Sequence, residues 1–294
     1  MEGAGADEQL VALYHRHVAT AFDRKLRLAE LVELKAGGAK WQYTVATATL
    51  AFGKLKFEAP LLGTHARGND SWLWAWSNRN LKLALTNRAL GDLVRVTAGR
   101  LGVPTLAHAG FSLEPLLGPE LTKHAADVLG GVLARELDFD AHFVADEGAH
   151  DSAILVRDDR LRAAERHPLF RVLTVFPKAV KTLPVFDHRA ALTAYARDYG
   201  LTATAEGGIL TITDGKGQLT ATFDEHDRLK KFEGANVAAP AAKKPAKAAP
   251  TKAPPKKADT KSAVPKARPA PKAAAKKPNK SAPKANAKKS TKKR

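Results

Sequence analysis

The stretch LLGTHARGNDSWLWAWSN, residues 61–78, contains three of the four tryptophans of this 294-residue chain. Successive side chains of a strand point to opposite faces, so the three indoles would share one face while Leu73 and Ala75 would share the other. Both faces are therefore apolar. This pattern predicts a central strand that is covered on both sides by the helices predicted before and after it.

Two interpretations of this ring cluster stay open. In the first, the rings fill a hydrophobic core, where each aromatic side chain buries about 150–250 Å². In the second, the rings and nearby polar groups form the wall of a small-molecule pocket. We favour the core, because aromatic residues at strand spacing are more often interior. The candidate pocket residues are His65, Asp70, Trp72, Trp74, Trp76 and Asn78.

Around this stretch, the apolar spacing predicts both helices and antiparallel strands. Residues 7–36 have the spacing of one long amphipathic helix, with Asp7 as its N-cap and Gly37 at its end. The spacing then changes to that of strands. Four short strands of one meander are predicted at 41–49, 55–59, 61–64 and 71–76. The further predicted elements are a helix that begins at 87, a helix over 119–137 with a weak point at Gly130–Gly131, and a hairpin of strands at 141–145 and 152–156.

A second, smaller unit is predicted after the hairpin. Its elements are helices over 169–180 and 187–199 and strands at 201–205, 209–213, 219–223 and 229–233. The fold class is therefore α+β: an antiparallel sheet packed with helices, followed by a smaller helix-plus-meander unit and a disordered C-terminal tail. The predicted domains are residues 1–160, 161–236 and 237–294.

Two motifs resemble those of a known family. LLGTH (61–65) followed by DSWLWAWSN (70–78) is similar to the signature of an uncharacterised bacterial domain family: Leu-Gly-Thr, a short loop, then Trp-Leu-Trp-Ala-Trp-x-Asn. The resemblance extends from the first helix to the hairpin near residue 157. FDHRAALTAY (186–195) and FDEHDRL (223–229) are similar to segments that follow this domain in its relatives. Because the function of that family is unknown, the resemblance implies no reaction.

Polar clusters elsewhere do not make a convincing catalytic or metal site. Residues two apart on a strand are about 6.6 Å apart, too far to bind one ion without a bend. This applies to three potential ligands in one predicted strand, Asp138, Asp140 and His142. The next loop matches no calcium motif, although it gathers Asp146, Glu147, His150 and Asp151. The chain has no cysteine and no P-loop, zinc-protease, nucleophile-elbow or dinucleotide motif. We therefore assign no catalytic residue, metal ligand or cofactor, and the sequence supports no enzymatic activity.

The charge of the chain is concentrated in its last segment. Residues 241–294 contain 19 of the 48 basic residues and one acid, Asp259, which leaves 29 bases and 29 acids in residues 1–240. The body is thus formally neutral, and the net charge of +18 belongs to the tail. The tail is almost entirely Lys, Ala and Pro, and it lacks large apolar side chains to bury, so it is predicted to be disordered.

A disordered polycation of this kind is expected to bind a polymeric anion. Its composition is similar to that of linker-histone tails and bacterial histone-like tails. The predicted nucleic-acid-binding residues are Lys243, Lys244, Lys247, Lys252, Lys256, Lys257, Lys261, Lys266, Arg268, Lys272, Lys276, Lys277, Lys280, Lys284, Lys288, Lys289, Lys292, Lys293 and Arg294.

Three roles for the tail compete. We favour nonspecific DNA binding over the binding of RNA or another polyanion, and over a solubilising or membrane-tethering role. No aromatic residue is available to stack on bases, so no sequence specificity is expected. No stretch approaches eighteen apolar residues, so no membrane insertion is expected, and a cytoplasmic, nucleoid-associated location is predicted. The alternative function is a small-molecule-binding or hydrolytic body with its pocket at the tryptophan face, the tail being only a tether or solubiliser.

Overall fold

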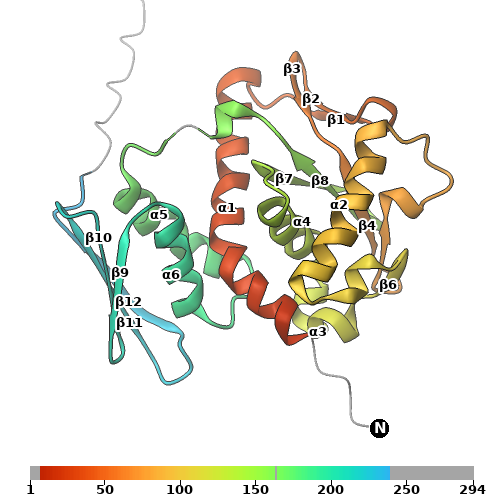
Figure 1. The fold of residues 1–294 in the computed structure, drawn as a ribbon. Coiled ribbons are helices and arrows are strands. Elements are labelled where there is room, and N and C mark those ends of the chain that lie inside the picture. The colour runs from red at the N-terminus through yellow and green to blue at the C-terminus, as the bar shows by residue number, and fades with distance from the viewer. Residues whose placement is uncertain (1–6, 163, 239–294) are drawn as a thin grey trace, which may run out of the picture. The chain divides into compact units, whose positions relative to one another are not determined.

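The computed structural model describes residues 7–162 and 164–238 of the chain, all within one compact unit, Met1–Ala242. These residues form helices and three antiparallel sheets, so the predicted α+β class is confirmed (Figure 1). Within this part of the chain, no helix is both long and apolar enough to span a bilayer. The predicted tail and its cationic residues lie outside the described residues, apart from 237 and 238. The division of the body at residue 160 stays a prediction.

The first helix, α1 (Glu8–Ala36), begins and ends where its capping residues predict. Asp7 accepts a hydrogen bond of 3.0 Å from the backbone N–H of Leu10, and Gly37 has a left-handed backbone with φ of 55°. The helix is buried on more than one side, because it packs against α4 (Ala125–Glu136), α5 (Pro168–Thr182) and α6 (His188–Asp198). It therefore joins the N-terminal and C-terminal parts of the body.

The predicted four-stranded meander is wrong, because its strands belong to two sheets. A small sheet holds β1 (Trp41–Thr44), β2 (Thr49–Phe52) and β3 (Leu55–Glu58). The single strand predicted over 41–49 is interrupted by a 3₁₀ turn at Val45–Thr47, after which Ala48 has a positive φ of 48°. A turn of this kind reverses the chain, so β1 and β2 pair with each other as a hairpin.

The second sheet has five strands in the order β6-β5-β4-β8-β7. Its members are β4 (Leu61–Ala66), β5 (Ser71–Trp74), β6 (Gly110–Ser112), β7 (Ala141–Asp146) and β8 (His150–Val156). The hairpin predicted at 141–156 is confirmed as β7 and β8. The strand with tryptophans ends at Trp74, because Ala75–Ser77 form a 3₁₀ turn. Its second face is not fully covered as predicted, since Leu73 is 40% exposed.

The helix predicted over 119–137 is two helices. Helix α3 (Glu114–Thr122) is kinked at Gly118, and residues 123–124 belong to neither helix, so they separate α3 from α4. The predicted weak point at Gly130 and Gly131 is instead continuous helix. A Cβ on Gly130 would lie 3.0 Å from the His142 ring, and one on Gly131 would lie 2.9 Å from Ala21. Glycine is needed here for close packing. The preceding helix, α2 (Leu85–Leu101), ends at Gly102.

The C-terminal part of the body has the predicted elements. Helices α5 and α6 are followed by β9 (Thr202–Glu206), β10 (Ile209–Thr213), β11 (Gln218–Phe223) and β12 (Leu229–Ala235). The four strands pair in sequence order as an antiparallel meander. Asp187 caps α6 by accepting a 2.7 Å hydrogen bond from the N–H of Ala190.

A buried carboxylate joins α1 to this C-terminal part. Asp23 is only 2% exposed, and its Oδ1 accepts a 2.6 Å hydrogen bond from Nε of Arg171 on α5. Its Oδ2 accepts a hydrogen bond from the hydroxyl of Tyr199 and lies 3.5 Å from Nε of Arg27. A carboxylate buried to this extent is stable only because cationic and hydroxyl donors surround it.

We predict that Asp23→Ala lowers the free energy of unfolding by about 3–5 kcal/mol, because it leaves the Arg171 guanidinium without its buried partner. Urea unfolding followed by circular dichroism measures the change. The matched control is Asp92→Ala, which removes a carboxylate that is 80% exposed and pairs with Arg95 on α2. This control should change stability by less than about 1 kcal/mol. Equal losses in the two variants would contradict the role assigned to Asp23.

We also predict that Gly63→Ala lowers the free energy of unfolding by about 1–3 kcal/mol through overpacking. A Cβ at residue 63 would lie 2.7 Å from the Trp72 ring and 2.8 Å from the carbonyl oxygen of Leu73. The control is Gly68→Ala, since a Cβ there would meet no atom within 4 Å. A loss at Gly63 no larger than at Gly68 would show that the ring does not rest on the strand.

Candidate functional site

The structure places two of the three clustered tryptophans in the hydrophobic core. Trp72 is 1% exposed and Trp74 0%, with their rings edge to face at 5.3 Å between centroids. Trp76 stacks on Trp74 at 4.7 Å and lies under the guanidinium of Arg95. These positions favour the core interpretation. Of the candidate pocket residues, Trp76 and Asn78 are half-buried and Asp70 is exposed.

Two polar residues proposed for this pocket, His65 and Asp70, belong to a separate network. His65 is 2% exposed on β4, and its Nε2 lies 3.3 Å from Oδ1 of Asp70. Its Nδ1 lies 3.8 Å from Oδ2 of Asp151, which also accepts two hydrogen bonds from Arg67. His65 is thus held between two carboxylates at one end of the sheet, where it orders the loop between β4 and β5.

The three potential ligands in residues 138–142 do not converge. Asp138 lies in a turn with φ of 56°, Asp140 accepts a 2.7 Å hydrogen bond from Arg162, and His142 faces α4. In the next loop Glu147 pairs with His150, while Asp146 and Asp151 contact the same arginine, Arg67. Among the described residues, no group of three or more His, Cys, Asp or Glu side chains has the geometry of a metal site.

A buried polar cluster that the sequence did not indicate connects α1, α4 and β7. Asp127 accepts hydrogen bonds from Lys25 at 2.6 Å and from Nε2 of His142 at 3.0 Å. Because a carboxylate only accepts, Nε2 carries the proton and Nδ1 of the neutral ring has a lone pair. This lone pair and the Tyr14 hydroxyl, both buried and without partners among the described residues, line a cavity of about 10 Å³. The cavity is too small for an organic ligand.

Burial and hydrogen bonding set the charges in this cluster. Burial lowers the pKa of His142 below its ordinary 6.5, so the ring is neutral at pH 7. Burial also opposes the charge of Asp127, but the hydrogen bonds from His142 and Lys25 outweigh this effect and hold the pKa of Asp127 well below its ordinary value. Burial, followed by the Asp127 charge, raises the pKa of Tyr14. Asp127 and Lys25 therefore form an ion pair with His142 as a neutral donor.

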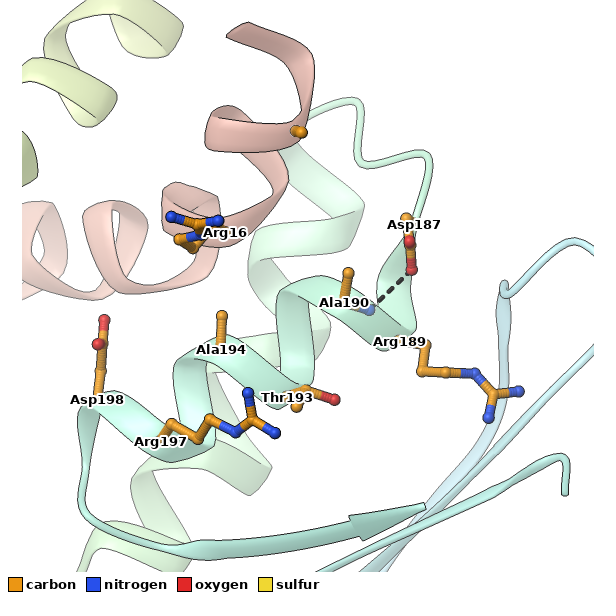
Figure 2. A pocket seen from close by; sticks show the side chains of 9 residues that line it. Arg16, Asp187, Arg189, Ala190, Thr193, Ala194, Arg197 and Asp198 are labelled. Atoms are coloured by element: carbon orange, nitrogen blue, oxygen red, sulfur yellow. Dashed lines mark hydrogen bonds between the residues drawn. The ribbon is translucent and has the colours of Figure 1, made fainter. Parts of the chain in front are cut away.

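A surface groove of about 510 Å³ follows the contact between α1 and α6 (Figure 2). Its floor is made of small side chains, and Figure 2 shows Ala190 and Ala194 pointing toward α1. Alanine at these positions lets the two helices approach closely. The charged residues that line the groove are Arg16, Asp187, Arg189, Arg197 and Asp198.

Several of these charges already have partners inside the body. Arg189 points away from the groove in Figure 2. Its Nε donates a 2.6 Å hydrogen bond to Oδ1 of Asp227. Asp198 accepts hydrogen bonds from Thr20 at 2.6 Å and from Arg135 at 3.2 Å. Arg16 and Arg197 are exposed, and neither has a carboxylate within 4.0 Å among the described residues. The groove therefore has two free guanidinium groups above an apolar floor.

The described part of the body is thus an α+β domain, and a smaller segment of helices and a meander packs on α1. The model of a family of unknown function, DUF6882, matches residues 11–159, about half of the chain. The chain belongs to this family, and the predicted membership in an uncharacterised domain family is confirmed. No curated protein and no solved structure matches the chain.

We predict that the body loses stability as the pH falls from about 7 to 5. Burial lowers the pKa of four histidines below 6.5, so the folded state binds fewer protons than the unfolded state as the pH passes below 6.5. The free energy of unfolding is therefore highest above pH 6.5. It decreases as the pH falls from 6.5 toward the lowered pKa values of the folded state. The four are His15, His17, His142 and His188.

Urea unfolding at several pH values measures this dependence. His142→Gln should reduce the slope by up to about 1.4 kcal/mol per pH unit, because it removes a ring that must stay neutral. The control is His226→Gln, because the His226 side chain is 77% exposed in the folded protein. A wild-type stability that is constant between pH 7 and 5 would contradict the assignment of neutral buried rings.

Proposed function

We propose that the protein holds its DUF6882 domain on nucleic acid through the cationic segment 241–294. The observation that carries this proposal is the separation of charge. The body has 29 bases and 29 acids up to residue 240, whereas the last segment has 19 bases and one acid. A molecule with this charge distribution is expected to bind a polymeric anion through its tail, because long-range electrostatic attraction depends on net charge.

The internal ion pairs of the body support this assignment. Much of its positive charge is already paired with carboxylates, and a paired guanidinium contributes little to the attraction of an external polyanion. The arginines in these pairs include Arg27, Arg67, Arg95, Arg100, Arg135, Arg160, Arg162, Arg171 and Arg189.

The chemistry of the segment favours nonspecific binding. Lysine is a compact point charge that neutralises phosphates, whereas bidentate reading of guanine requires arginine, of which the segment has two. It has no aromatic residue to stack on bases. We therefore propose duplex DNA as the main partner, bound through its phosphates, and a nucleoid-associated location for the protein. RNA and other polyanions are competitors by the same chemistry.

The alternative proposal, a small-molecule pocket at the tryptophan face, meets a physical obstacle. Trp72 and Trp74 are almost fully buried, and exposing either ring would cost roughly 3 kcal/mol or more of hydrophobic stabilisation. A ligand at that face would therefore contact Trp76 and Asn78 first.

We predict that the affinity for a labelled duplex falls steeply with salt. If about eight cations engage phosphates, the slope of log K against log salt is about −7. Fluorescence anisotropy of the full chain between 50 and 200 mM salt measures it. A variant that has the 17 lysines of 241–294 replaced by glutamine should lose nearly all affinity.

The matched control is a chain whose segment 241–294 is scrambled at constant composition. It should bind like the wild type, because only the charge density matters in a nonspecific complex. Undiminished binding by the glutamine variant would place the binding surface in the body instead. A loss of binding on scrambling would contradict the nonspecific mode.

A further inference from the structure

A second hollow lies beside the groove of Figure 2 and shares Asp198 with it. Its volume is about 310 Å³, which is at the lower end of the range for small-ligand sites. It is bounded by α1, by the last turn of α4, by the end of α6 and by Leu161, Arg162, Ala164 and Glu165. The arginines that line it are Arg24, Arg27, Arg135 and Arg162.

Most charges of this pocket are balanced by fixed partners. Asp23 is shared by Arg27 and Arg171, and the Nη2 of Arg27 lies 3.2 Å from Oε2 of Glu165. Arg162 donates from Nε to Oδ1 of Asp140 at 2.7 Å. These pairs build the wall of the pocket.

Arg24 is the exception. Its Nη1 donates to two backbone carbonyls, that of Phe139 at 2.8 Å and that of Asp140 at 3.5 Å. No carboxylate lies within 4.0 Å of its guanidinium among the described residues, although the side chain is half-buried. Burial, followed by the nearby charge of Arg135, lowers the pKa of Arg24 from its ordinary value, and the carboxylates of Asp140 and Asp198 offset this effect only in part. A half-buried cation without a carboxylate in direct contact is costly to keep.

Arg135 adds a second set of donors at the same place. Its Nη2 pairs with Oδ2 of Asp198 at 3.2 Å, while its Nε is buried and has no hydrogen-bond partner among the described residues. Asp198 is one of three carboxylates that line the pocket, and Thr20 and Arg135 already bind its Oδ2. The residues that line the pocket carry four guanidinium groups and three carboxylates. The excess positive charge is assigned to Arg24, which has no carboxylate in direct contact among the described residues.

We propose that this pocket binds the phosphate group of a small phosphorylated molecule, with Arg24 and Arg135 as its ligands. The planar fork of a guanidinium binds phosphate oxygens in pairs, and an anion at this point neutralises the guanidinium of Arg24. The cations converge inside a recess and do not form an exposed stripe, which suits a small molecule and not the backbone of a nucleic acid. This site is independent of the cationic segment 241–294.

Thermal unfolding of the full chain, with inorganic pyrophosphate as the probe, tests the proposal. Millimolar pyrophosphate should raise the Tm of the wild type above its value in sodium chloride of equal ionic strength, because binding to the folded state stabilises it. Arg24→Gln and Arg135→Gln should each weaken the apparent affinity at least tenfold. Arg88→Gln removes an exposed arginine of α2 and should respond like the wild type.

The three variants share the same cationic segment, so differences between them report on the pocket. Circular dichroism before heating shows whether each variant is folded, and Arg24→Lys provides a second, milder change that should also weaken binding. A wild-type Tm that pyrophosphate leaves unchanged would overturn the proposal. An equal rise in the Arg24 and Arg88 variants would do the same.

Two further arms define the ligand. Citrate carries carboxylates in place of phosphates and should raise the Tm less than pyrophosphate does, whereas an equal or larger rise would overturn the choice of phosphate. Affinity for duplex DNA should be the same in Arg24→Gln and Arg88→Gln. A selective loss of DNA binding in Arg24→Gln would overturn the small-molecule assignment and would identify a nucleic-acid phosphate as the ligand.

Discussion

The carboxylate of Asp23 is the interaction on which the arrangement of the body depends. It lies in the middle of α1 and is bound by Arg171 of α5 and by Tyr199 after α6, so it orients the helices of the C-terminal part against α1. Burial, followed by the Asp23 charge, raises the pKa of Tyr199, which keeps its hydroxyl a donor. The same contacts form one wall of the pocket that holds Arg24 and Arg135, so the fold and the proposed phosphate site share one electrostatic network.

Close contact between rings and glycines governs the N-terminal part in a similar way. The Trp72 ring lies over Gly63 of β4, and the Trp76 ring lies against Gly91 of α2, where a Cβ would be 2.8 Å away. The His142 ring lies over Gly130 of α4. Protein interiors are packed so closely that one added methyl group at such a position would clash with the ring. These glycines serve packing and not chain flexibility.

The distribution of charge assigns the two proposed partners, nucleic acid and a small phosphate, to different parts of the chain. Equal numbers of bases and acids make the body neutral overall, so the net charge lies in residues 241–294. Within the pocket, the half-buried Arg24 has no carboxylate within 4.0 Å among the described residues and is a local exception to this balance. A polymeric anion responds to the sum of many exposed charges, whereas a small phosphate responds to two guanidinium groups fixed in one pocket. The two partners can therefore be bound by different parts of one chain.

The sequence alone determined the α+β class, the cap and end of α1, the β7–β8 hairpin and the C-terminal helices and strands, because each depends on local patterning and capping. Only the tertiary structure decided that the strands after residue 40 divide between two sheets, and that Gly130 and Gly131 continue a helix. It also brought Arg24 and Arg135, 111 positions apart, to one pocket. Pairing partners and buried charges depend on contacts between distant residues, and periodicity does not record which distant residues meet.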